Sequence, residues 1–117
     1  MDDADAANLR DMLKAARQAS SYVAGQRLAD LESKGMLRDA VERQLEIIGE
    51  AARRVSVQFR EAHPQIPWSR IIAQRNVIAH EYGDIKVEWI WRVATERMPE
   101  LIAQLEPLIP PTPKDED

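Results

Sequence analysis

The sequence predicts an all-α fold, an antiparallel bundle of four main helices with an extra short helix and a kinked last helix. Apolar residues recur at steps of three and four through most of the chain, which is the period of an α-helix. The chain shows no alternating strand pattern, no internal repeat and no glycine-rich phosphate loop. Because the connections between the helical segments are short, we expect consecutive helices to be antiparallel neighbours.

The composition fits one domain. The chain has 117 residues, of which 44% are apolar, and this is enough to fill one core of ordinary size. We expect a flexible acidic N-terminus at residues 1–5, a single helical domain at residues 6–109, and a proline-rich charged tail at residues 110–117.

Two helical segments are expected in the first third of the chain. The first runs from about residue 5 to residue 24, where leucine, methionine and alanine side chains fall on one side, and Gly25 closes it. A short helix is expected over residues 27–33, with Gly35 as its stop.

The longest periodic segment predicts one helix from Met36 to about Glu61. Its apolar residues step by four, four, three, four, three and four residues from Leu37 to Phe59. A second apolar side, which includes Ile47, indicates contact with two neighbours. This helix is therefore expected to lie at the centre of the bundle or at a dimer contact.

Prolines divide the second half of the chain. Pro67 follows a proline break and suits the first position of a helix that continues to about residue 82. The last helix is expected to begin near Ile85 with Asp84 as its cap. Pro99 should kink this helix or start a new segment.

The composition also excludes several classes of site. The chain has no cysteine and only two histidines in dissimilar contexts, so we expect no metal site and no cofactor. The N-terminus lacks a basic segment followed by an apolar run, and no later stretch has the roughly 20 apolar residues that a membrane span needs. We therefore expect a cytoplasmic protein without a membrane partner.

The charge is unevenly distributed along the chain. The net charge is -4, but the two tails hold six acidic residues, so residues 6–114 sum to +2. Between residues 53 and 75, five arginines are opposed by Glu61 alone. Arg53, Arg54 and Arg70 are therefore candidates for a surface that faces RNA phosphates, and the alternative is a solvated basic face without a ligand.

The segment Arg75–Tyr82 departs from an ordinary packing helix. With Ile71 at zero and 100 degrees per residue, Arg75 lies at about +40 degrees, in the middle of the apolar sector. A guanidinium keeps its charge when it is buried, so it needs an anion. That anion is either the carboxylate of Glu46 or Glu50, in a structural pair, or a phosphate that enters from outside.

On the same wheel His80 lies about 140 degrees from Arg75, whereas Asn76 lies about 40 degrees from His80. A site that uses both Arg75 and His80 therefore has to be a cleft that both sides of this helix reach, unless the last turn departs from α geometry. The alternative for His80 is a helix cap, because an imidazolium interacts favourably with the C-terminal dipole.

The pattern R-x4-H-x-Y, formed by Arg75, His80 and Tyr82, resembles the signature of HepT-type toxins, which are small helical ribonucleases of the HEPN superfamily. Residues 45–52 (LEIIGEAA) and 66–68 (IPW), ahead of the motif helix, resemble the arrangement in the same family. The resemblance covers about residues 9–106 and implies that residues 6–109 form a HEPN-like domain.

The resemblance implies a metal-independent endoribonuclease that acts on RNA and not on DNA. It implies a homodimer in which the motif helices of both subunits line a shared cleft, so that the dimer supplies two histidines. His80 would serve as acid or base and Arg75 would stabilise the phosphate. Asn76 would orient the imidazole or contact phosphate. The carboxylate of Glu46 or Glu50 would pair with the Arg75 guanidinium and hold it in position.

The resemblance also implies a protein partner. In the family, the tyrosine equivalent to Tyr82 is modified by a minimal nucleotidyltransferase antitoxin that attaches AMP groups, which would put charge and bulk beside Arg75. One alternative is a non-catalytic helical binding module that partners a nucleotidyltransferase. Another is a structural dimerisation bundle.

Overall fold

The computed structural model describes residues 1–80 and 87–110, except for the side chains of residues 79 and 80. The described part is helical and contains no strand, so the predicted all-α bundle is confirmed. Its main elements are α1 (Asp3–Val23), α3 (Gly35–Arg54), α5 (Trp68–His80) and a last segment made of α6 (Val87–Arg92), the π-helical η1 (Val93–Arg97) and α7 (Met98–Leu105). The shorter elements are α2 (Leu28–Ser33), α4 (Val57–Ala62) and the 3₁₀ turn η2 (Glu106–Leu108).

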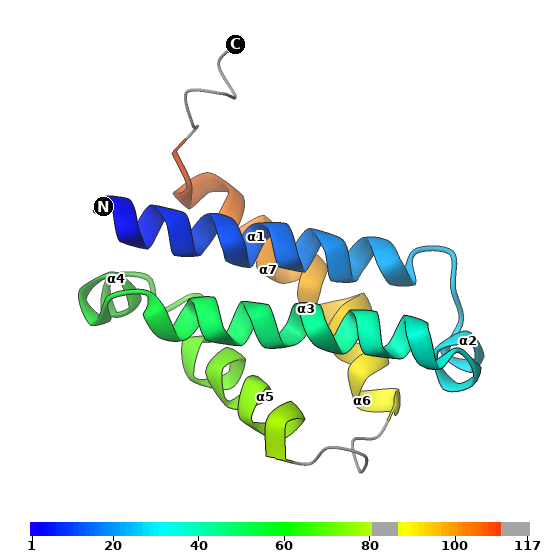
Figure 1. Cartoon of the computed structure of the whole chain (residues 1–117). Coiled ribbons are helices and arrows are strands. Elements are labelled where there is room, and N and C mark those ends of the chain that lie inside the picture. The colour runs from blue at the N-terminus through cyan, green and yellow to red at the C-terminus, as the bar shows by residue number, and fades with distance from the viewer. Residues whose placement is uncertain (81–86, 111–117) are drawn as a thin grey trace.

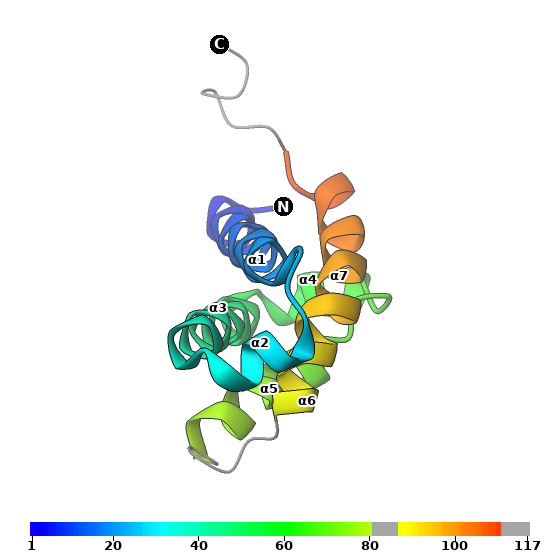
Figure 2. The same ribbon diagram turned by 90° about the vertical axis from the view of Figure 1, so that its right-hand side faces the viewer.

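The helix α3 lies at the centre of the bundle, as its two apolar sides predict. It packs most extensively against α1 and α5, while α7 packs against α1. Figure 1 shows α1 and α3 side by side with opposite chain directions, and Figure 2 shows α5 on the side of α3 that faces away from α1. None of the described helices is long and apolar enough to cross a membrane.

A single apolar core joins these helices. The largest side chains that are fully buried come from every main element except α5, whose Ile71 and Ile78 are also buried, at 5% and 2% exposure. The largest fully buried side chains are Leu9, Met12, Leu31, Leu45, Ile48, Ile66, Ile90, Met98, Leu105, Val41, Val55 and Val93.

The acidic N-terminus, which was expected to be a flexible segment at residues 1–5, includes the cap and the first residues of α1. Asp2 caps α1 by accepting a hydrogen bond from the Asp5 backbone nitrogen at 2.7 Å, and the helix begins at Asp3. Asp5 is only 5% exposed, and its carboxylate accepts hydrogen bonds from the Ser56 backbone nitrogen (2.8 Å) and hydroxyl (2.6 Å). A buried carboxylate needs such donors, and they hold the start of α1 against the end of α3.

The prediction of one long helix from Met36 to about Glu61 is wrong, because α3 ends at Arg54 and the chain turns there. Val55 has an extended backbone, and Ser56 caps α4 by accepting a hydrogen bond from the Phe59 backbone nitrogen at 3.2 Å. Val55 is buried although it lies in the turn, so the apolar period of the sequence continues past the end of α3. Gly35, predicted as the stop of the short helix, is instead the first residue of α3.

Two other predicted breaks are confirmed. Gly25 adopts a positive φ of 75° after α1, as a helix-closing glycine does. Pro99 lies in the first turn of α7, and the preceding π-helical turn ends at Arg97. The predicted cap Asp84 and helix start Ile85 lie outside the described residues, as do residues 111–117 of the predicted tail.

Candidate functional site

The site is built where α5 crosses α3, and a glycine sets how closely the two helices approach. Gly49 lies in the middle of α3 and is buried. A methyl group at Gly49 would lie 2.5 Å from the Cβ of Arg75 and 3.2 Å from the Ile71 carbonyl oxygen. Any larger residue would therefore push the helices apart, and the glycine lets the Arg75 stem lie directly on α3.

This close approach places Arg75 at the edge of the α3–α5 contact. The Arg75 side chain is 39% exposed, so the burial expected from its position in the apolar sector is wrong. Its Nε lies 3.2 Å from Oε2 of Glu50. Of the two carboxylates considered from sequence, Glu50 is the partner, whereas Glu46 pairs with Arg43 at 3.6 Å.

Glu50 is shared by three arginines. Its Oε1 accepts a hydrogen bond from Arg53 at 2.8 Å and lies 3.1 Å from Nη2 of Arg54, while Oε2 faces Arg75. The hydrogen bond from Arg53 lowers the pKa of Glu50, and the charges of the three arginines act in the same direction against partial desolvation. One ionised carboxylate therefore faces three cations, which leaves the cluster with an excess of positive charge.

A groove of about 260 Å³ opens beside this cluster, between α1, α3 and α5. It is lined by three basic and three acidic side chains together with Ile47 and Ala51; the charged ones are Arg43, Arg54, Arg75, Asp11, Glu46 and Glu50. An anion that enters the groove must therefore compete with carboxylates for the arginines. Arg75 contacts Glu50 through Nε and not through a terminal nitrogen, whereas Arg43 and Arg54 make their contacts through terminal nitrogens.

The other predicted site residues are distributed over several places. Asn76 is exposed on α5, and His80 is the last residue of that helix. The His80 side chain and Tyr82 lie outside the described part of the chain. Arg53 and Arg54 adjoin Arg75 through Glu50, but Arg70 does not join this surface.

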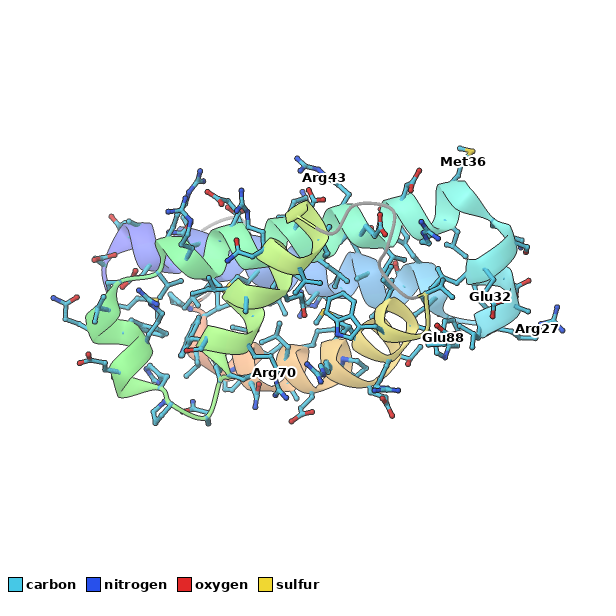
Figure 3. The ribbon with its side chains drawn as sticks, turned by 90° about the horizontal axis from the view of Figure 1, so that it is seen from below. Arg27, Glu32, Met36, Arg43, Arg70 and Glu88 are labelled. Atoms are coloured by element: carbon cyan, nitrogen blue, oxygen red, sulfur yellow. The ribbon has the colours of Figure 1, made fainter. Side chains whose placement is uncertain are left out.

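The separation of Arg70 is visible in Figure 3, where Arg43 and Arg70 lie at opposite edges of the face that α5 crosses. Arg70 lines a recess between α5 and η1–α7 together with Arg97. The basic surface expected from the clustering of arginines in the sequence is therefore divided into two by α5.

Two contributors were not identified from the sequence as parts of the site. Gly49 has a recognisable signal, because a glycine inside a strongly periodic helix lowers helix stability by about 1 kcal/mol and therefore indicates a packing role. Asp11 carries no such signal, because it reaches the groove from α1 only through the packing of α1 on α3.

Replacing Gly49 by alanine is expected to lower the free energy of unfolding by about 1–3 kcal/mol, because the added methyl group overpacks the crossing with Arg75. Urea denaturation measures this change. Gly35→Ala is the matched control, since a methyl group at Gly35 has no neighbour within 4 Å. If Gly49→Ala were as stable as Gly35→Ala, the close approach of the helices would be contradicted.

Comparison with known proteins finds a family model that covers most of the chain. The family model described as "Ribonuclease HepT-like" matches residues 12–108. The chain is 33% identical over 98 residues to "Putative RNase MJ1380" of Methanocaldococcus jannaschii, which covers 84% of this chain and 90% of that protein.

Two further relatives carry similar names. "Putative RNase TTE0752" of Caldanaerobacter subterraneus subsp. tengcongensis is 34% identical over 87 residues, covering 74% of this chain and 78% of that protein. "Probable ribonuclease HepT" of Thermococcus cleftensis is 38% identical over 69 residues, covering 59% and 63%. No solved structure matches the chain. The match over residues 12–108, which includes Gly49, Glu50 and Arg75, shows that the chain belongs to the HepT-like ribonuclease family.

Proposed function

We propose that the chain is a metal-independent endoribonuclease toxin that acts in the cytoplasm and is neutralised by a nucleotidyltransferase antitoxin. Membership in the HepT-like ribonuclease family supports RNA cleavage. At the level of residues, the proposal rests on the position of Arg75. Its partly exposed guanidinium stands at a charged groove, on the same helix as His80.

Arg75 supplies fixed positive charge to the scissile phosphate. Its Nε is oriented by Glu50 at 3.2 Å, which leaves the two terminal nitrogens for a second anion. A planar guanidinium holds two phosphate oxygens through paired hydrogen bonds, and these bonds strengthen as negative charge develops at phosphorus. Glu50 acts as the positioning residue, because Arg53 and Arg54 hold its other oxygen in place.

His80 carries the proton transfers. One histidine removes the proton from the 2′-hydroxyl, and the 2′-oxygen then attacks the adjacent phosphorus. The bond between phosphorus and the 5′-oxygen breaks, and a second histidine donates a proton to that oxygen. The products are a 2′,3′-cyclic phosphate and a 5′-hydroxyl, so atoms and charges balance without water. Asn76 orients the imidazole or contacts the phosphate.

A homodimer supplies the second histidine. Ile47 and Ile72 remain only partly buried against the core, and Ile47 lines the groove beside Arg75. A second copy that covers this side of α3 and α5 would bury these side chains and bring both His80 residues to one cleft. This arrangement would also cover Ile47, which belongs to the second apolar side of α3.

Tyr82 is the proposed site of control. It follows His80 by two residues in the motif, so an AMP group on its hydroxyl adds a phosphate and a nucleoside next to the catalytic residues. That phosphate competes with RNA for Arg75. The cognate nucleotidyltransferase therefore neutralises the toxin by occupying the position of the substrate.

Co-expression with the nucleotidyltransferase, followed by intact-mass measurement and an RNA cleavage assay in EDTA, tests this proposal. We expect the mass to rise by multiples of one AMP group, and the modified protein to lose cleavage that the unmodified protein shows. Tyr82→Phe is expected to keep its mass and its cleavage activity under the same conditions, because it lacks the hydroxyl that accepts AMP.

Two outcomes would contradict the proposal. An unmodified protein that leaves RNA intact would favour the non-catalytic binding module. A mass shift that persists in Tyr82→Phe would place the modification on another residue.

A further inference from the structure

A second recess lies on the other side of α5 from Arg75, between α5 and the last helical segment, and it combines an apolar floor of Pro67, Ile71, Met98 and Leu101 with charged and amide side chains. Its volume is about 30 Å³, which is room for one or two small polar atoms such as phosphate oxygens and too little for a nucleobase. Its polar and charged lining comes from Arg70 and Gln74 of α5, and from Arg97, Glu100 and Gln104 of η1 and α7.

Gln74 is the unusual member of this recess. It is only 4% exposed, and its side-chain Nε2 is buried without a hydrogen-bond partner among the described residues. A buried amide donor without a partner costs about 1–3 kcal/mol, so an ordered water or an anion that accepts its hydrogen bond would stabilise the fold at this point. Gln104 lines the same recess, but its side chain makes its hydrogen bond to the Gln65 carbonyl oxygen, at 3.0 Å, and none to Gln74.

Arg70 and Arg97 add two cations to the same recess. Within residues 1–80 and 87–110, neither arginine forms an ion pair, whereas Arg53, Arg54 and Arg75 all share Glu50. Glu100 also lines the recess and offsets one of the two charges. The lining is therefore net positive, with donors in excess of acceptors.

Arg97, which lines the recess, is the last residue of the π-helical turn. Pro99 has no backbone N–H, so the regular hydrogen bond to the Thr95 carbonyl is missing, and the turn over Val93–Arg97 widens to π geometry. The Thr95 hydroxyl donates to the Trp91 carbonyl oxygen at 2.7 Å within this segment. Single π turns are frequent at functional sites, because the extra residue redirects a side chain.

The geometry points to this recess as a phosphate-binding subsite for the RNA strand, with Gln74, Arg70 and Arg97 as the donors. The inference rests on the proposed ribonuclease function and extends it to the path of the substrate. Arg70 precedes Arg75 by five residues, which is about 7 Å along the helix axis, and Figure 3 shows it at the edge opposite Arg43. Because Arg70 also lies about 140 degrees from Arg75 around the helix, a strand that crosses α5 has one phosphate at Arg75 and a more distant one at the recess.

RNA binding by the full chain in a His80→Ala background tests this subsite without cleavage. We expect the double variant Arg70→Gln/Arg97→Gln to bind a short fluorescent single-stranded RNA about tenfold more weakly. The slope of log affinity against log salt concentration should fall by about 0.7, as one lost phosphate contact on a single strand does. Arg27→Gln is the control for the loss of a surface charge away from α5, since Arg27 is 81% exposed at the far end of the molecule in Figure 3.

The side-chain amide resonance of Gln74 gives a direct readout that a change in overall charge does not move. We expect this resonance to shift when RNA is added, and inorganic phosphate at the same phosphate concentration to shift it less. A larger shift with inorganic phosphate than with RNA would overturn the inference in favour of a free-anion site. No shift with either would overturn it altogether.

The failure of this inference is distinguishable from failure of the proposed function. If the protein binds RNA and the double variant matches Arg27→Gln in affinity and salt slope, the recess assignment alone is overturned. If the protein binds no RNA, both are overturned. If the double variant changes the molar mass in light scattering, the recess belongs to a contact between copies of the chain.

Discussion

Replacing His80 by alanine is expected to lower the rate of RNA cleavage about 10²- to 10⁴-fold, because a positioned acid or base contributes this much to a proton transfer. The protein should remain folded, since His80 is the last residue of α5 and its helix is held by Ile71 and Ile78 in the core. Initial rates on a defined RNA, measured across pH, give the comparison. The remaining activity of the variant should no longer show the pH dependence of an imidazole near neutral pH.

The other histidine of the chain provides the control. His63 follows α4, where its ring lies against Phe59 with centroids 4.2 Å apart, and it does not line the Arg75 groove. We expect His63→Ala to cleave RNA at close to the parent rate. Equal losses in His63→Ala and His80→Ala, or an unchanged rate in His80→Ala, would remove His80 from the mechanism.

Arg75→Ala is expected to lower the cleavage rate about 10²- to 10³-fold, which is the usual effect of removing a preorganised donor that faces developing negative charge. Arg75→Lys should recover only part of this loss, because an ammonium keeps the charge but cannot hold two phosphate oxygens in one plane. The loss should appear mainly in kcat, since the contact strengthens in the transition state.

Arg54→Gln is the matched control for Arg75, because Arg54 contacts the same Glu50 carboxylate, at 3.1 Å, and lines the same groove. We expect this variant to weaken RNA binding and to leave kcat nearly unchanged, because the hydrogen bond from Arg53 at 2.8 Å still holds Glu50 in place. If Arg54→Gln and Arg75→Ala lost the same factor in kcat, general charge in the groove would explain the effect and Arg75 would have no special place.

The helical period in the sequence was sufficient to predict the all-α bundle and the central place of α3. It could not predict the turn after Arg54, because Val55 and Phe59 continue the apolar period on both sides of the turn. The turn is held by the contact between Asp5 and Ser56, which are 51 residues apart in sequence. For the same reason Asp5 was assigned to a flexible end, since its partner is distant along the chain.

The candidate site was predicted in part. The requirement that Arg75 have an anionic partner is met by Glu50, one of the two carboxylates named from the sequence. The exposure of Arg75 was not predicted correctly, because a helix wheel does not show that this residue lies at the edge of the contact between α5 and α3. Arg70 was grouped with Arg53 by closeness in sequence, but it lies about 140 degrees from Arg75 around α5 and faces η1 and α7.

The chemistry of the cut ends is the most direct test of the central claim, that this chain cleaves RNA without a metal through His80 and Arg75. Purified protein is incubated with a defined RNA in EDTA, and the termini of the fragments are identified by mass spectrometry. We predict fragments that end in a 2′,3′-cyclic phosphate and begin with a 5′-hydroxyl. Intact RNA, or fragments with 3′-hydroxyl and 5′-phosphate ends, would contradict this mechanism.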